Sequence, residues 1–148
     1  MIKIFIVDDK AIVTSQLEER LTKMGYEVTG KASSGEAAIE MLKRFRADLV
    51  LMDIVMPGKM NGIKAARVIR EELDIPVIFL TGHAEDEFIE EAKSASPFGY
   101  IVKPFREREM KAVIDIGVYK KGIERLLRES EERFRTVADF TYDWEYWI

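Results

Sequence analysis

The stretch LVLMD at residues 49–53 decides the fold, because four apolar residues run without interruption and end in an acidic one. Strands of a parallel sheet are buried on both faces and read as such continuous runs. Three further mainly apolar runs, each followed by a polar residue, are IKIFIV at 2–7, VIFL at 77–80 and YIV at 100–102. In an open α/β sheet the carboxyl ends of the strands border the crevice in which ligands bind. The polar residues after these runs are therefore expected to share one acidic pocket: Asp8, Asp9, Asp53, Thr81 and Lys103.

Helical patterns separate these runs, which implies right-handed crossovers between parallel strands. We expect helices over residues 11–24, 37–45, 61–73 and 85–95, and an additional strand over 26–32. Ser33 and Glu36 fit a capping box before the second helix, and Asn61 fits the N-cap of the third. The chain is predicted to be an α/β protein with a doubly wound five-stranded parallel sheet and five helices, the last of them extended.

The composition and the net charge of the chain argue against several classes of function. The 148 residues, 47% of them hydrophobic, are enough for one full core and one main domain. A net charge of -4, with 34% charged residues of both signs, argues against nucleic acid as the principal partner. The absence of cysteine excludes disulfides, thiolate metal sites and cysteine nucleophiles. No stretch approaches the roughly 18 apolar residues of a membrane span and no signal-peptide pattern opens the chain, so we expect a cytoplasmic protein.

One unusually long helix is predicted from Glu107 to about Ala138. Apolar residues recur there in alternating steps of three and four, at Ile116, Tyr119, Ile123 and Leu126. This spacing is typical of a paired coiled coil, so we expect a homodimer formed through the extended helix, although Ser130 and Arg133 weaken the seam. A solvated single helix with Glu and Arg pairs is the rival interpretation. The aromatic segment DFTYDWEYWI at 139–148 is predicted to be a strand.

Three carboxylates in one pocket repel one another. At ~4 Å and an effective dielectric near 20, each pair costs on the order of 4 kcal/mol, so a cation or a proton is required. A few oxygen ligands beside a phosphate site suit Mg²⁺. With the cluster neutralised, a carboxylate such as Asp53 can attack an electrophilic phosphorus and form an aspartyl phosphate. Lys103 would then pair with one phosphoryl oxygen, and Thr81 would donate a hydrogen bond to another.

A plainer interpretation is that the same residues serve only local structure. Asp8 and Asp9 could cap the first helix, Thr81 could cap the fourth, and Lys103 could be a surface lysine. That interpretation requires a coincidence at four strand ends together. The functional interpretation is therefore favoured.

Residues 1–120 resemble the receiver domain of two-component response regulators. The motifs that carry the resemblance are IVDD at 6–9, LVLMDIVMPG at 49–58 with Asn61-Gly62, Leu80-Thr81-Gly82, and YIVKPF at 100–105. The resemblance implies a flavodoxin-like sheet of strand order 2-1-3-4-5. It also implies that a histidine kinase or phosphotransfer protein supplies the phosphoryl group, and that the domain accepts this group without being an enzyme in the usual sense.

The same resemblance assigns roles to individual residues. Asp53 is the phosphoacceptor, and Mg²⁺ is held by Asp9, Asp53 and the backbone carbonyl of Val55, with Asp8 acting mainly through a metal-bound water. Thr81 and Lys103 hold the phosphoryl group. Thr81 and Tyr100 form the switch, and the Lys103–Pro104 bond is expected to be cis.

Two features of the resemblance concern tuning of the site. Lys59 makes the loop after Asp53 one residue longer than the commonest pattern of the family. Val55 and His83 stand where the family varies the residues that set the lifetime of the phosphoryl group. A lone loop histidine is also commonly an incidental polar side chain, which is the alternative for His83.

The end of the chain carries a second resemblance. Residues 127–135, together with Asp143-Trp144-Glu145, resemble the entry to PAS sensor domains through a signalling helix. We therefore divide the chain into a receiver at 1–120, a signalling helix at 121–138 and the truncated start of a PAS-like domain at 139–148. The full-length protein is then expected to continue into a PAS domain and a histidine kinase. An isolated receiver with a helical tail is the rival.

Three other functions compete with a phosphoacceptor. A magnesium-dependent phosphatase of the haloacid-dehalogenase type also uses a strand-end aspartate, but it normally needs a second aspartate where this chain has Val55. A nucleotide-binding module is disfavoured because neither GxxxxGK[ST] nor GxGxxG follows a predicted strand. A phosphorylation-independent scaffold usually loses part of the site, whereas this chain keeps all five residues.

Overall fold

The computed structural model describes the backbone of residues 1–56, 60–82 and 89–146, and the side chains of the same ranges except at 89 and 133–146. By its internal contacts the chain divides into two units, Met1–Val118 and Tyr119–Ile148. The first unit holds the sheet and its helices, and the described part of the second is helical.

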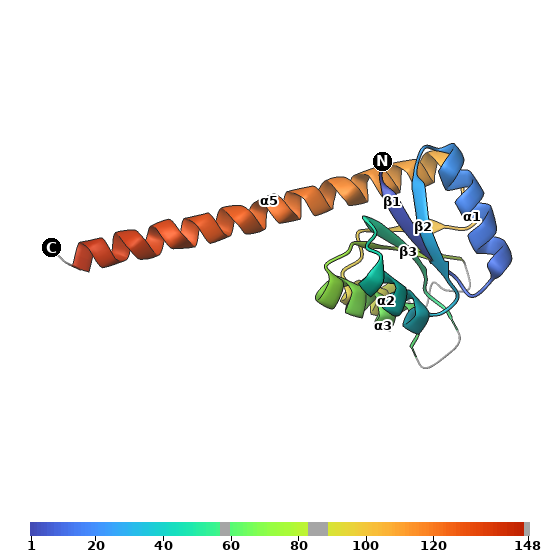
Figure 1. The fold of residues 1–148 in the computed structure, drawn as a ribbon, viewed down its shortest axis with the longest axis horizontal. Helices are drawn as coiled ribbons and strands as arrows, with labels where there is room; N and C mark the ends of the chain where they lie inside the picture. Colours follow the sequence, from blue (N-terminus) through green and yellow to red (C-terminus); the bar gives the residue numbers. More distant parts are fainter. Residues whose placement is uncertain (57–59, 83–88, 147–148) are drawn as a thin grey trace. The chain divides into compact units, whose positions relative to one another are not determined.

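Five parallel strands form the sheet in the order β2-β1-β3-β4-β5, which confirms the predicted flavodoxin-like topology (Figure 1). The strands are β1 Lys3–Val7, β2 Glu27–Ala32, β3 Leu49–Asp53, β4 Val77–Thr81 and β5 Gly99–Val102. Every residue of β3 and β4 is buried, as expected for central parallel strands that are covered on both faces.

Helices connect the strands. They are α1 Ala11–Lys23, α2 Gly35–Arg44, α3 Gly62–Val68 with a π-helical continuation η1 Ile69–Leu73, α4 Ile89–Ala92 with a 3₁₀ turn η3 Lys93–Ala95, and α5 Glu107–Tyr146. The helix predicted over 85–95 is thus present from residue 89, and its first residues lie outside the described part of the chain. None of the described helices combines the length and the apolar composition that a membrane crossing requires.

Alternate residues of the strands lie on opposite faces of the sheet and pack in two separate hydrophobic cores. Phe5 and Met52 belong to the core beneath α2 and α3, whereas Ile6 and Leu51 belong to the core beneath α1 and the start of α5. All four side chains are at most 1% exposed. Figure 1 shows α1 on one side of the sheet and α2 and α3 on the other. Packing on both faces thereby fixes the carboxyl ends of the strands next to one another. The candidate functional side chains lie at these ends.

The N-cap of α2 differs from the predicted one. Ser34, not Ser33, is the N-cap, and its hydroxyl accepts a hydrogen bond from the N–H of Ala37 at 3.2 Å. Glu36 is therefore only two residues after the cap, and it cannot close the predicted capping box. Its carboxylate instead accepts a hydrogen bond from the N–H of Met60 at 3.0 Å.

The end of α5 also differs from the prediction. Residues 139–146, predicted to be a strand, continue the helix as far as Tyr146. A strand needs a neighbour to pair its N–H and C=O groups, and the five strands that the structure describes pair only with one another. A helix satisfies the same groups internally, which outweighs the aromatic strand preference of this segment.

Candidate functional site

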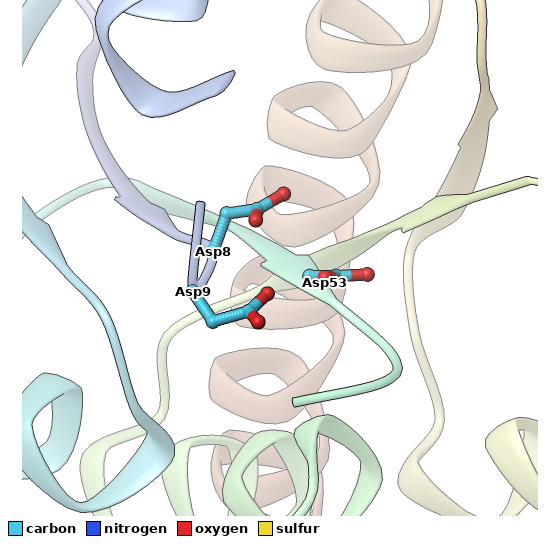
Figure 2. Close-up of side chains that lie close together, drawn as sticks. All are labelled: Asp8, Asp9 and Asp53. Atoms are coloured by element: carbon cyan, nitrogen blue, oxygen red, sulfur yellow. The ribbon is translucent and has the colours of Figure 1, made fainter. Parts of the chain in front are cut away.

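Three carboxylates meet at the carboxyl ends of two adjacent strands. Asp53 is the last residue of β3, and Asp8 and Asp9 directly follow β1, its neighbour in the sheet. One oxygen atom of each carboxylate lies within 4.8 Å of those of the other two. Figure 2 shows the three side chains gathered at this edge. The acidic cluster predicted from the strand ends is therefore present.

The cluster lies largely beneath the surface. Asp8 is 1% exposed and Asp53 is 3% exposed, while Asp9 reaches solvent. Burial raises the pKa of Asp8, and the nearby charge of Asp9 raises it further. The N–H of Lys10, which donates to Asp8 Oδ1 at 2.9 Å, and the charge of Lys103 lower this pKa in part. The site thus holds negative charge at an electrostatic cost that a cation would offset.

The acidic residues are not helix caps for α1. The N-cap of this helix is Lys10, whose side chain makes no capping hydrogen bond. The hydrogen bond that Asp8 accepts comes from the N–H of Lys10, which precedes the helix. The plainer interpretation of Asp8 and Asp9 is therefore not supported by the geometry.

The donor set fits a small divalent cation. It consists of carboxylate oxygens close enough to share one ion, and hard cations such as Mg²⁺ prefer oxygen ligands. Among the described residues, Oδ2 of the buried Asp8 accepts no hydrogen bond, which leaves its lone pairs available to an ion. Val55 lies two residues after Asp53, and its side chain is exposed at the edge of the site.

Thr81 and Lys103 border the cluster from the next strands of the sheet. Thr81 ends β4, is 3% exposed, and donates a long hydrogen bond of 3.4 Å to the carbonyl of Gly82. The N–H of Lys103 donates to the carbonyl of Thr81 at 2.8 Å, and its Nζ lies 4.0 Å from Asp8 Oδ2. The Lys103–Pro104 peptide bond is cis. A cation and a hydroxyl thus stand at the strand ends beside the carboxylates.

Residues 4–115 match the family model of the response regulator receiver domain. The chain belongs to this family. The curated transcriptional regulatory protein PdtaR of Mycobacterium tuberculosis is 34% identical over 116 residues, which are 78% of this chain. The same match covers 56% of PdtaR, so the chain spans about half the length of this relative.

Solved receiver domains share the fold. A signal receiver domain of a modulated diguanylate cyclase from Desulfovibrio desulfuricans G20 superposes with a TM-score of 0.79 at 30% identity, covering 84% of this chain and 98% of the other. The N-terminal domain of a response regulator/sensory box/GGDEF 3-domain protein from Carboxydothermus hydrogenoformans gives a TM-score of 0.74 at 30% identity. That match covers 82% of this chain and 98% of the other.

Tyr100 of the receiver domain lies in β5 beside Phe79 of β4. The two ring centroids are 6.1 Å apart, and the planes are inclined by 33°. The ring packs partly buried against the core on the α2 and α3 face. Its hydroxyl oxygen is buried and has no hydrogen-bond partner among the residues described, and burial raises the pKa of the phenol. Among the described residues the ring is thus held by packing, while His83, the other candidate near Thr81, lies outside the described residues.

Two residues that the sequence indicated for other reasons turn out to lie beside the receiver site. Gly62 opens α3 so close to β3 that a Cβ atom there would lie 1.9 Å from the carbonyl oxygen of Asp53. Glu36 reaches the same region from α2 through its bond to Met60. A glycine directly after the predicted N-cap Asn61 is a signal that could have indicated Gly62. Nothing local marks Glu36, because its partner is 24 residues away.

Proposed function

We propose that this receiver domain accepts a phosphoryl group on Asp53 from a histidine kinase or a phosphotransfer protein. A carboxylate oxygen of Asp53 attacks the phosphorus, and the bond between phosphorus and the donor breaks, leaving an aspartyl phosphate. The observation that carries the proposal is the cluster of three carboxylates within 4.8 Å, with a lysine at its edge.

Each residue of the site has a proposed role in this transfer. Asp8, Asp9, Asp53 and the backbone carbonyl of Val55 would hold Mg²⁺. When bound, the ion supplies positive charge that offsets the carboxylates and the incoming phosphoryl oxygens. Lys103 would pair with one phosphoryl oxygen, and the Thr81 hydroxyl would turn from its long bond with Gly82 to donate to another.

The response to phosphorylation is proposed to pass through Thr81 and Tyr100. A phosphoryl group adds charge and acceptor oxygens, so it draws the threonine hydroxyl toward itself. Tyr100 is suited to respond, because its hydroxyl forms no hydrogen bond to another described residue that a movement of the ring would have to break. Val55 and His83 are proposed to tune the lifetime of the phosphoryl group.

A labelling experiment tests the proposal. Incubation with acetyl phosphate and Mg²⁺ should add one phosphoryl group per chain, detected by intact mass spectrometry, and Asp53→Asn should add none. Asp48→Asn is the matched control, because Asp48 precedes the same strand at its opposite end and an asparagine can still accept the hydrogen bond from Lys3 N–H. Labelling that persists in Asp53→Asn would reject the assignment.

The receiver is proposed to control an output domain that follows it in a cytoplasmic signalling protein. The proposed division is a receiver at 1–120, a signalling helix at 121–138 and the start of a PAS-like domain at 139–148. One relative of known structure is described as the first domain of a response regulator/sensory box/GGDEF protein, which supports such an arrangement. The full-length protein is then proposed to be a histidine kinase.

We also propose that the second unit pairs with the same segment of another copy. Tyr119, Ile123, Leu126 and Leu127 are all at least 40% exposed along α5, which is unusual for large apolar side chains on one helix. Burying them against a second helix would stabilise both. Light scattering should then give twice the mass of one chain, and Leu126→Lys should give a monomer. Arg125→Glu is the control, because the helical repeat puts Arg125 on the other side of α5. A monomeric wild-type protein at high concentration would contradict the proposal.

A further inference from the structure

We infer that Glu36 is a positioning residue for the metal site, because it holds the backbone at Met60 in residues 60–62, the segment that leads into α3. Its Oε1 accepts a hydrogen bond from the backbone N–H of Met60 at 3.0 Å. Glu36 belongs to the first turn of α2, and among the residues described its hydrogen bond goes to Met60 rather than to the acidic cluster. This inference rests on the proposed function, since it concerns the position of the Val55 carbonyl that is proposed to bind Mg²⁺.

The approach of α2 that brings Glu36 to this segment depends on Gly35. A Cβ atom at Gly35 would lie 2.7 Å from the Cβ of Ala65 in α3 and 3.4 Å from the carbonyl oxygen of Met60. The first is closer than packed carbon atoms can come. The glycine therefore lets the start of α2 contact α3 directly. The consecutive residues Gly35 and Glu36 thus supply the close approach and the hydrogen bond, and these are two independent observations at one place.

The segment 60–62 is also tied to the residue that follows β3. The N–H of Gly62 donates to the carbonyl of Ile54 at 3.0 Å, and Asn61 Oδ1 accepts from the N–H of Lys64 at 2.9 Å. Ile54 directly precedes Val55. Glu36 thus holds residues 60–62 at Met60, and Gly62 joins the same residues to Ile54, so a shift at Met60 should reach the backbone beside Val55 through the Gly62–Ile54 hydrogen bond.

Metal binding is sensitive to such positioning. Ligand oxygens must stand at nearly ideal octahedral positions for Mg²⁺, and a backbone carbonyl can be placed only by the chain around it. A hydrogen bond from an N–H to a carboxylate is stronger than one between neutral groups. Loss of this bond should leave the three carboxylates in place but loosen the carbonyl of Val55.

Isothermal titration with Mg²⁺, without any phosphodonor, tests the inference on three variants. Glu36→Ala should weaken Mg²⁺ binding about tenfold, equivalent to ~1.4 kcal/mol, with little change in the melting temperature of the metal-free protein. Glu36→Gln should stay within about threefold of the wild type, because the amide oxygen can still accept from Met60 N–H. Glu40→Ala is the control on the same helix, since Glu40 is exposed and pairs only with Lys43 among the residues described.

Two results would overturn the inference. Unchanged Mg²⁺ affinity in Glu36→Ala would show that the bond does not position the site. Equal weakening in Glu36→Gln and Glu36→Ala would show that the negative charge acts rather than the hydrogen bond. Amide hydrogen exchange at Met60 provides a second readout, which should accelerate in Glu36→Ala and not in Glu36→Gln. Failure of the proposed function would appear separately, as absence of acetyl phosphate labelling in the wild type.

Discussion

Lys103 Nζ lies 4.0 Å from Asp8 Oδ2, a side chain that is completely buried, whereas the lysine side chain is 29% exposed. The ammonium therefore already partners the acidic cluster before any phosphoryl group arrives. At this distance the attraction is weakened by solvent on the side of the lysine. A metal ion and the lysine ammonium would thus interact with the same carboxylate. Each cation should therefore weaken the binding of the other.

Replacement of Lys103 should separate metal binding from phosphoryl transfer. Lys103→Met keeps the alkyl chain and removes the charge, so the cluster becomes more negative and Mg²⁺ should bind several-fold more tightly. Labelling by acetyl phosphate should slow at least about tenfold, because one phosphoryl oxygen loses its charged partner. Titration calorimetry and mass spectrometry measure the two effects. Lys64→Met, an exposed lysine of α3, should change neither. Weaker Mg²⁺ binding in Lys103→Met would contradict this account.

Asp8 should lower the stability of the metal-free protein while it contributes to metal binding. Its pKa is raised by burial, so the folded state holds a proton more tightly than the unfolded state, and the ionised side chain opposes folding at neutral pH. Asp8→Asn should therefore raise the unfolding free energy in EDTA by about 1 kcal/mol, a usual size for one substitution. Added Mg²⁺ should stabilise this variant less than the wild type. Urea denaturation with and without Mg²⁺ measures both, and a destabilised metal-free variant would argue against electrostatic strain.

Gly62 should tolerate no side chain. Gly62→Ala would place a Cβ 1.9 Å from the carbonyl oxygen of Asp53, so β3 and α3 must separate. We expect a loss of about 2–4 kcal/mol in unfolding free energy and loss of labelling. The matched control is Gly122→Ala in α5, where nothing lies within 4 Å of the added atom. That variant should gain about 0.5–1 kcal/mol of helix stability. Denaturant melts followed by circular dichroism compare the two, and equal effects would refute the steric argument.

Tyr26 should anchor α5 to the sheet in a pH-dependent way. Its hydroxyl donates to Asp115 Oδ1 at 2.8 Å, and burial, followed by this bond and the charge of Asp115, raises the pKa of Tyr26. Tyr26→Phe should cost about 1 kcal/mol at neutral pH.

The sign of the pH effect follows from the raised pKa. The stabilisation is complete below the unfolded pKa near 10 and is lost as pH rises further, because the unfolded phenol ionises first. The stability difference between wild type and Tyr26→Phe should therefore shrink above pH 10 in urea melts. A gap that widens in this range would exclude the proposed origin of the shift.

The sheet and the acidic cluster could be predicted because both follow from local patterns. Runs such as LVLM at 49–52 are too apolar to lie at a surface, and in parallel strands the residues that follow them must share one edge. Once the strands alternate with helices, right-handed crossovers leave few strand orders. Asp8, Asp9 and Asp53 meet for this reason, with no need for tertiary detail.

Other features could not be read from local patterns. Ser33 and Ser34 are equally good caps by residue type, and the contact of α2 with α3 at Gly35 and Ala65 accompanies the choice of Ser34. The aromatic segment 139–146 has the composition of a strand but is helical as far as Tyr146. Strand preference depends on a pairing partner, which a sequence pattern does not supply.

The sequence by itself determined the strand ends, and hence which acids stand together, because burial and chain direction are encoded in the order of apolar residues. Only the tertiary structure decided how the segment after Asp53 is held, through Glu36 and Met60 and through Gly62 against the carbonyl of Asp53. Those contacts join residues that are distant along the chain or depend on an atom that glycine lacks. Their energies arise from ångström-scale distances, which no periodicity records.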